Sequence, residues 1–278
     1  MQMTTINCKG KLIDLMIPKV MGILNITPDS FYDGGKLKTD GSVLKQAEKM
    51  LLEGATFLDI GGQSTRPNAE FLSADDELNR ISSVVSLLIT EFPEILISID
   101  TFYSKVADEC LQLGASLIND ISAGSLDENM FDVIAKYKVP FVMMHMRGNP
   151  RTMQQMVSYD DLVKDILFYF SQKIMKARSY GINDLILDPG FGFSKTLEQN
   201  FELLSKIELL SIADLPILIG ISRKSMIYKT LDVTAQEALN GTTVLNTIAI
   251  TKGAKILRVH DVKEAVETIR LCEMTKNN

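Results

Sequence analysis

The sequence predicts an α/β protein, a (β/α)₈ TIM barrel with a short N-terminal β-hairpin. Eight strand-like apolar runs alternate with eight helix-like runs within about 250 residues, the size typical of this barrel. Several of the expected helices end at glycine (Gly54, Gly114, Gly181 and Gly253), the residue preferred at a left-handed C-cap. A doubly wound open sheet is the alternative, but no Gly-x-Gly-x-x-Gly follows the first strand, which disfavours its dinucleotide-binding version.

The hairpin is expected over residues 4–18, where two apolar runs flank a Lys-Gly-Lys turn, and it would close the bottom of the barrel. The strands are short apolar runs that end abruptly at polar or turn residues. They are expected near 20–26, 56–60, 95–99, 116–119, 140–145, 184–188, 216–221 and 255–259. The helices are expected near 42–54, 74–91, 103–113, 127–138, 160–180, 197–212, 234–252 and 262–274.

With 46% apolar and 23% charged residues, the composition suits one large globular domain or two small ones, and the eight successive units favour a single domain over residues 1–278. The net charge is −6 and no long basic block occurs, which argues against nucleic acid as a partner. No apolar run reaches the roughly 18 residues of a membrane span. The N-terminus does not read as a secretory signal, and Cys8, Cys110 and Cys272 lack metal-ligand spacing. We therefore expect a cytoplasmic protein with unpaired thiols.

The most informative stretch is residues 185–193, in which a buried strand ends at Asp188 and is followed by Pro189, Gly190 and Gly192. These three residues end the strand in a sharp loop. The strand therefore carries one carboxylate to its C-terminal end, where parallel α/β proteins bind their ligands.

Other polar residues end neighbouring strands. Asp100, Asn119 and Asp188 form a set of acceptors that suits the donor-rich edge of a heterocycle with an amidine or guanidine-like group. Asn25 ends the first strand and is read either as a metal or phosphate contact or as a turn former. Asp100 and Asp120 could instead cap the helices that follow them.

The second strand ends in paired glycines, which allow close backbone approach to a ligand, and Thr65 and Arg66 follow. This stretch is read either as part of a ligand site or as a solvated loop. The loops at 27–41 and 61–73 are long and polar, lie on the expected catalytic face and would close over a substrate. In the fifth strand Met144 is read as core or as the floor for a flat ring, and His145 as a structural histidine.

The last two strands end in cations. Period-2 alternation places Arg258 and His260 on one side of the eighth strand, next to Lys224 and Ser225 after the seventh. Loops after these strands frequently bind phosphate in barrels, although surface charge is the ordinary reading of a Ser-Arg-Lys run. The residues alone thus indicate a barrel enzyme for a polar heterocycle that carries phosphate.

Seven motifs in order closely resemble the bacterial dihydropteroate synthase family, and the match runs from about residue 3 to residue 274. They are Met-Gly-Ile-Leu-Asn-Ile-Thr-Pro-Asp-Ser-Phe (21–31), Asp-Ile-Gly-Gly-Gln-Ser-Thr-Arg-Pro (59–67), Ile-Asn-Asp-Ile (118–121), Met-His-Met-Arg-Gly-Asn-Pro (144–150), Asp-Pro-Gly-Phe-Gly-Phe (188–193), Ser-Arg-Lys-Ser (222–225) and Arg-Val-His-Asp-Val (258–262).

The resemblance implies a pterin-binding barrel of folate biosynthesis. Such transferases join 6-hydroxymethyl-7,8-dihydropterin diphosphate to p-aminobenzoate, release pyrophosphate, need Mg²⁺, form homodimers and are sulfonamide targets. By the family pattern Asn25 would contact Mg²⁺, and the catalytic residues would be Asp100, Asp188, Lys224, Arg258 and His260. The substrate contacts would include these five and Phe31, Thr65, Arg66, Pro67, Asn119, Met144, Phe193, Ser225 and Val259. Helix 234–252 is a candidate dimer face.

Two positions depart from the family pattern: Gln63 stands where Glu is usual and Asn68 where Gly is usual, and both flank the aminobenzoate loop. A corrinoid-dependent pterin methyltransferase domain would lack the Ser-Thr-Arg-Pro loop and would not need the anion site. A catalytically silent paralogue would be expected to lose the charges at the strand ends. The Ser-Thr-Arg-Pro loop, the anion site and the charges at the strand ends are all present, so the sequence favours the synthase.

Overall fold

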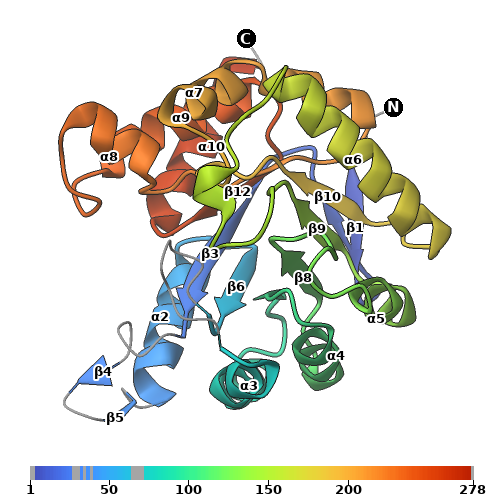
Figure 1. Ribbon diagram of the computed structural model, residues 1–278. Helices are drawn as coiled ribbons and strands as arrows, with labels where there is room; N and C mark the ends of the chain where they lie inside the picture. The colour runs from blue at the N-terminus through green and yellow to red at the C-terminus, as the bar shows by residue number, and fades with distance from the viewer. Residues whose placement is uncertain (1–3, 27–31, 34–35, 38–39, 64–71, 277–278) are drawn as a thin grey trace.

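The structure is a computed structural model that describes residues 4–26, 32–33, 36–37, 40–63 and 72–276 (Figure 1). Its centre is an eight-stranded parallel sheet with the order β10-β9-β8-β7-β6-β3-β12-β11. The strands are β3 (Lys19–Asn25), β6 (Phe57–Gly61), β7 (Ile97–Asp100), β8 (Leu117–Asp120), β9 (Phe141–Met144), β10 (Leu185–Asp188), β11 (Leu218–Ile219) and β12 (Ile256–Val259).

The two ends of this sheet meet. Leu187 of β10 forms a parallel bridge with Ile217, just before β11, and its backbone N–H donates to the carbonyl of Pro216 at 2.9 Å. The sheet is therefore a closed barrel, as predicted, and the open-sheet alternative is excluded.

Helices surround the strands (Figure 1), and most lie where the sequence placed them. They are α2 (Asp40–Leu52), α3 (Ala74–Glu91), α4 (Ser104–Leu113), α5 (Met130–Tyr137), α6 (Leu162–Ser179), α7 (Leu197–Ser205), α8 (Ser225–Leu231), α9 (Leu239–Thr251) and α10 (Val262–Lys276). Two 3₁₀ helices lie between these elements, Met153–Gln155 before α6 and Ile207–Ala213 after α7. Side chains of Ser73, Asp161 and Thr196 cap the N-termini of α3, α6 and α7. Among these described helices, none has both the length and the apolar character that a membrane span needs.

Two helix predictions were wrong. The segment 197–212 is α-helical only to Ser205 and then becomes a 3₁₀ helix, in which Ile207 and Leu210 are buried at the three-residue spacing of that helix type. The predicted helix 234–252 begins only at Leu239, and the sequence reading missed α8, which ends at Asp232 in the left-handed conformation.

The predicted hairpin is present, with β1 (Thr5–Cys8) paired antiparallel to β2 (Lys11–Asp14). Its buried side chains, including Ile6 and Ile13, pack against the first inward-facing residues of the barrel strands, such as Phe57 and Ile256. The hairpin therefore closes the N-terminal end of the barrel and leaves the C-terminal end as the mouth. A second small hairpin, β4 (Tyr32–Asp33) with β5 (Lys36–Leu37), lies in the loop after β3.

Candidate active site

The inward-facing layer above the apolar barrel floor is polar. On each strand the residue two positions after a floor residue points to the same side, because side chains alternate along a strand. Phe57 is thus followed by Asp59, Leu117 by Asn119, and Ile256 by Arg258. Strand register then aligns Asp59 with Ser98, Asp100 with Asn119, and Asp188 with Met144. A parallel barrel with this sequence must therefore gather these side chains at its mouth.

Arg258 lies between two carboxylates. Its Nε donates to Asp59 Oδ2 at 2.6 Å, and one terminal nitrogen donates to Asp100 Oδ2 at 2.6 Å. Asp59 is fully buried and also accepts from the Ser98 hydroxyl at 2.5 Å and from Asn119 Nδ2 at 3.0 Å. Asp59 therefore fixes the arginine and the asparagine together. This residue was not among those chosen from the sequence.

The charges in this group depend on burial and on each other. Burial raises the pKa of Asp100 to about 7 against the opposing effect of Arg258. Burial also opposes the charge of Arg258, but Asp59 and Asp100 outweigh it and keep the pKa of Arg258 above its usual value. The arginine therefore remains a cation, while burial favours the neutral form of Asp100 before a substrate arrives.

Asp188 and Lys224 form the opposite wall. Burial raises the pKa of Asp188, while Lys224 and the Gly190 N–H, at 2.8 Å from Oδ1, favour its ionised form. Burial lowers the pKa of Lys224 to about 8. The Lys224 ammonium donates to the carbonyl of Phe191 and lies 4.9 Å from the centre of the Phe193 ring.

An apolar cluster continues from this wall. Met144 is 3% exposed and Phe193 is 9% exposed, and they pack together with four further buried side chains. Those four are Phe102, Ile121, Met146 and Met153. The methionine-rich strand therefore contributes an inward-facing thioether next to Asp188, which suits the face of a flat ring.

The last strand divides its residues between two sides. His260 is exposed at the end of β12 and its backbone N–H donates to the Ser222 hydroxyl at 3.2 Å. The side chain of Val259, in contrast, is fully buried in the core between the strands and the helices. The side chain of Val259 therefore does not reach the mouth. Side chains alternate along a strand, so the residue next to the inward-facing Arg258 must face outward. Ser225 is the first residue of α8 and is partly exposed.

The two cations of the run Ser222-Arg223-Lys224 have different roles, because Arg223 is already paired within the protein. Its guanidinium pairs bidentately with Asp261 at 2.7 and 2.8 Å, and it also donates to the carbonyls of residues 235 and 236. Arg223 thus ties the loop after β11 to the loop before α9, while Lys224 alone turns toward the mouth.

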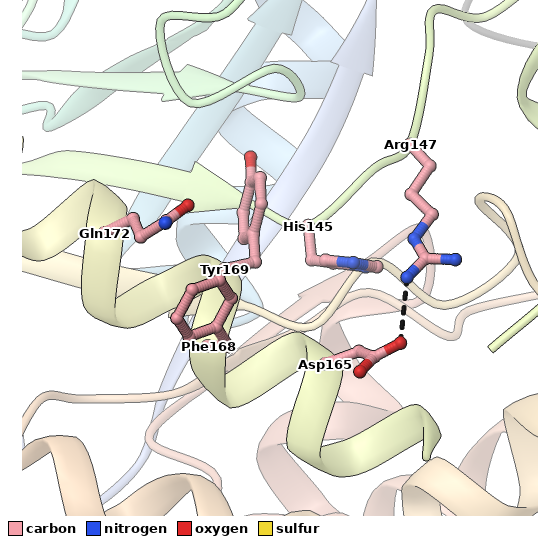
Figure 2. Close-up of a pocket in the computed structure, with 6 residues that line it drawn as sticks. All are labelled: His145, Arg147, Asp165, Phe168, Tyr169 and Gln172. Carbon is pink, nitrogen blue, oxygen red and sulfur yellow. Dashed lines mark hydrogen bonds and ion pairs between the residues drawn. The ribbon is translucent and has the colours of Figure 1, made fainter. Parts of the chain in front are cut away.

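His145 lies outside the barrel, in agreement with its reading as a structural histidine. It is 1% exposed, and its Nδ1 lies 3.0 Å from the Lys195 ammonium. Figure 2 shows it against α6, beside the Arg147–Asp165 ion pair, at the edge of a surface cavity of about 280 Å³. Burial lowers the pKa of His145 well below its usual value, and Lys195 and Arg147 act in the same direction. The ring is therefore neutral.

The two proposed helix caps were wrong. Asp120 instead accepts from the hydroxyl and N–H of Ser122 and from the N–H of Gly124, so it organises the loop after β8. Asp100 binds Arg258, and the residue at the N-cap of α4 is Tyr103.

Four predicted contacts, namely Phe31, Thr65, Arg66 and Pro67, lie outside the described residues, as does Asn68. Gln63 is described and buried, and its Oε1 accepts from the backbone N–H of Leu72 at 3.0 Å. Asn25 ends β3, partly exposed, in register with Gly61. Within the described ranges no group of three or more His, Cys, Asp or Glu residues is arranged to hold a metal ion.

The closed barrel, with carboxylates, an arginine and a lysine gathered at its C-terminal mouth, defines a TIM-barrel enzyme for a polar substrate. A family model described as pterin binding enzyme matches residues 21–260. The dihydropteroate synthase of Escherichia coli is 44% identical over 269 residues, which cover 96% of this chain and 95% of the relative. The Synechocystis enzyme of the same name is 44% identical over 257 residues, or 91% of this chain and 89% of the relative.

Solved structures agree with these sequence matches. Yersinia pestis dihydropteroate synthase in complex with a sulfonamide drug has a TM-score of 0.92 and 43% identity, over 99% of this chain and all of the other. The Xanthomonas albilineans enzyme with 4-aminobenzoic acid has a TM-score of 0.92 and 34% identity, over 99% of each chain. The chain belongs to the pterin binding enzymes and, within them, to the dihydropteroate synthases, which are transferases.

Proposed function

We propose that the barrel mouth joins 6-hydroxymethyl-7,8-dihydropterin diphosphate to p-aminobenzoate with release of pyrophosphate. The observation that carries this proposal is the group of Asp59, Asp100, Asn119 and Asp188, which places several acceptors around the barrel mouth, all of them buried except the partly buried Asp100. Family membership and the ligands named for the related structures support the same reaction.

The acceptors match the amino-pyrimidine edge of a pterin, which presents adjacent N–H groups. Asn119 donates its amide N–H to Asp59, so its side-chain carbonyl remains available as an acceptor at the mouth. Asp188 offers a second acceptor, because Gly190 engages only its Oδ1. Met144 lies next to Asp188 and would cover one face of the ring.

The cations would bind the diphosphate. Nε and Nη2 of Arg258 are engaged by Asp59 and Asp100, whereas Nη1 has no hydrogen bond to any described residue. That terminal nitrogen, together with exposed His260, would contact the phosphate oxygens, and Lys224 would contact the pterin. Charge-assisted hydrogen bonds of this kind stabilise a leaving pyrophosphate as its charge develops.

We further propose that Mg²⁺ assists the reaction, with Asn25 as a protein ligand. Mg²⁺ prefers oxygen ligands and usually keeps several waters while it binds one or two protein groups and the substrate phosphates. One side-chain carbonyl at the end of β3 fits such a site. When bound, the ion would neutralise charge on the departing pyrophosphate.

The chain's own residues would then favour a stepwise reaction. If the C–O bond breaks before the aminobenzoate nitrogen attacks, the positive charge that forms on the pterin lies near the carboxylates of Asp100 and Asp188. Phe193, packed against the Lys224 ammonium, and Ser225 at the start of α8 would contact the aminobenzoate. A kinetic isotope effect at the aminobenzoate nitrogen on pyrophosphate release would contradict this order of steps.

The test is pyrophosphate release by purified protein with the pterin diphosphate and Mg²⁺, with and without p-aminobenzoate. Lys224→Ala and Asp188→Ala should lose most of their turnover, whereas Lys136→Ala, which removes a surface ion pair with Asp108, should keep the wild-type rate. Pterin binding without pyrophosphate release would instead indicate a silent paralogue and would withdraw the roles given to Arg258 and His260.

We also propose that the chain forms a homodimer through α9 and α10, which pack on each other. Their outer sides present Val244, Leu271 and Met274, which are 50%, 70% and 64% exposed. Light scattering after size exclusion would measure the mass, and Leu271→Glu should yield monomers if this face is the interface. A cytoplasmic location stays a prediction.

A further inference from the structure

We infer that Lys195 is a positioning residue that fixes the loop carrying Phe191 and Phe193, and through it the Lys224 ammonium. This inference rests on the proposed function, because Lys224 and Phe193 are the groups that would touch the substrates. Lys195 does not itself reach the mouth: it is 5% exposed and lies behind the loop, on the side of His145.

The Lys195 ammonium has three partners at hydrogen-bond distance. The carbonyls of Gly190 and Phe193 accept at 2.9 and 3.0 Å, and His145 Nδ1 lies at 3.0 Å. An ammonium has three N–H groups and no acceptor, so these three partners satisfy it completely. Since His145 is neutral and Lys195 donates to its Nδ1, the imidazole proton belongs on Nε2.

The two carbonyls bracket the segment that forms one wall of the mouth. Between them lies Phe191, whose carbonyl accepts from Lys224, and at the end lies Phe193, whose ring faces the same ammonium at 4.9 Å. Gly190 and Gly192 both have positive φ values, 71° and 82°, so this loop relies on hydrogen bonds rather than side-chain bulk for its shape. Lys195 supplies two of those bonds from one buried atom.

The charged groups around Lys195 come from several elements. Burial lowers the pKa of Lys195, and Lys224 and Arg147 act in the same direction, whereas Asp188 of β10 opposes them and the three acceptors around the nitrogen favour the charged form. Burying the charge of Lys195 is unfavourable. The hydrogen bonds that it donates to backbone carbonyls offset this cost, because a buried carbonyl without a donor is itself destabilising.

The experiment compares Lys195→Met with Lys173→Met. Methionine keeps a straight chain of similar volume and removes all three donors. Lys173 is the matched control, because its ammonium also donates to a backbone carbonyl, that of Ala123 at 2.8 Å, and to Ser125. We expect Lys195→Met to fold and to lower kcat/KM for p-aminobenzoate by about 10- to 100-fold, as small misplacements of reacting groups do. Lys173→Met should stay within about twofold of the wild type.

A double variant separates positioning from general damage. If Lys195 acts through Lys224, then Lys195→Met should add less than about twofold to the loss caused by Lys224→Met, because the two residues act as one unit. Reductive methylation of Lys224, followed by mass spectrometry, should be faster in Lys195→Met than in Lys173→Met. If Lys195→Met fails to fold, Lys195→Gln, which retains two donors, takes its place in the same cycle.

Independent, multiplying losses in the double variant would overturn the inference, and so would a Lys195→Met protein with wild-type kinetics or unchanged methylation of Lys224. A wild-type protein that releases no pyrophosphate with both substrates would instead refute the proposed function. In that case the methylation rates alone would still decide whether Lys195 fixes Lys224.

Discussion

Glu77 is a buried carboxylic acid whose replacement should make the protein more stable at neutral pH. It lies on α3 with 0% exposure, and neither carboxylate oxygen has a hydrogen-bond partner of good geometry among the described residues. Burial raises the pKa of Glu77 from 4.5 to about 8, against the Thr101 hydroxyl and Arg80, which favour the ionised form, while Asp100 acts in the same direction as burial. The side chain is therefore protonated in the folded state at neutral pH.

The sign of the effect follows from the proton balance. Between pH 4.5 and about 8 the folded state binds a proton at Glu77 that the unfolded state lacks, so stability falls as pH rises through this window. At pH 7 the loss of folding stability has built up over about 2.5 pH units, from the unfolded pKa of 4.5 to pH 7. At about 1.36 kcal/mol per unit this loss amounts to roughly 3 kcal/mol. Glu77→Gln has the same shape as the neutral acid and carries no such penalty.

The assay is urea unfolding followed by circular dichroism at pH 5, 6, 7 and 8. Glu77→Gln should match the wild type near pH 5 and exceed it by up to about 3 kcal/mol at pH 7. Glu91→Gln, on the exposed end of the same helix, is the control and should follow the wild type at every pH. Parallel pH profiles for Glu77→Gln and wild type would show that Glu77 is ionised in the fold and would refute the reasoning.

Three further predictions concern the mouth. Asp59→Asn should lower kcat/KM for the pterin diphosphate by about 10-fold or more in the pyrophosphate assay, because Arg258 loses one of its two carboxylate partners. Activity like that of the wild type would show that Asp100 alone fixes the arginine. Affinity for the pterin diphosphate should fall as pH rises through about 8, where Lys224 loses its charge, and calorimetry on Lys224→Arg should lack that fall. Removal of Mg²⁺ with EDTA should stop pyrophosphate release, and added Mg²⁺ should restore it. Asn25→Ala should raise the Mg²⁺ concentration that gives the half-maximal rate. Release that persists in EDTA would show that the reaction does not need the ion.

The barrel was predictable because its signals are local and repeated. Each strand is a short apolar run with a polar end, and closure needs nothing beyond eight such units with helices between them. The elements that were missed depend on contacts between distant segments instead. Helix α8 is only seven residues long, and the segment before α9 is held by Arg223, which ties it to Asp261.

The candidate site was predictable only as far as strand ends could be recognised. Asp100, Asn119, Asp188 and Arg258 were found because each polar side chain follows an apolar run. Asp59 has the same signal, since it follows Phe57 by two positions on its strand, and attention to alternation in the second strand would have found it. Lys195 carries no comparable signal, because only the folded loop brings two carbonyls and an imidazole around its ammonium.

The contacts of Arg258 change the simplest picture of this mouth, in which acceptors for the heterocycle and cations for the phosphate occupy separate walls. Arg258 would belong to both, because Asp59 and Asp100 hold two of its nitrogens while the third has no hydrogen bond to a described residue and would be available to an anion. A guanidinium fixed in this way loses little side-chain entropy when a diphosphate binds, and it needs no reorganisation as pyrophosphate leaves. It would also link the two halves of the proposed reaction. Because Arg258 stays fixed, its hydrogen bond to Asp100 would also hold that carboxylate beside the positive charge that forms on the pterin.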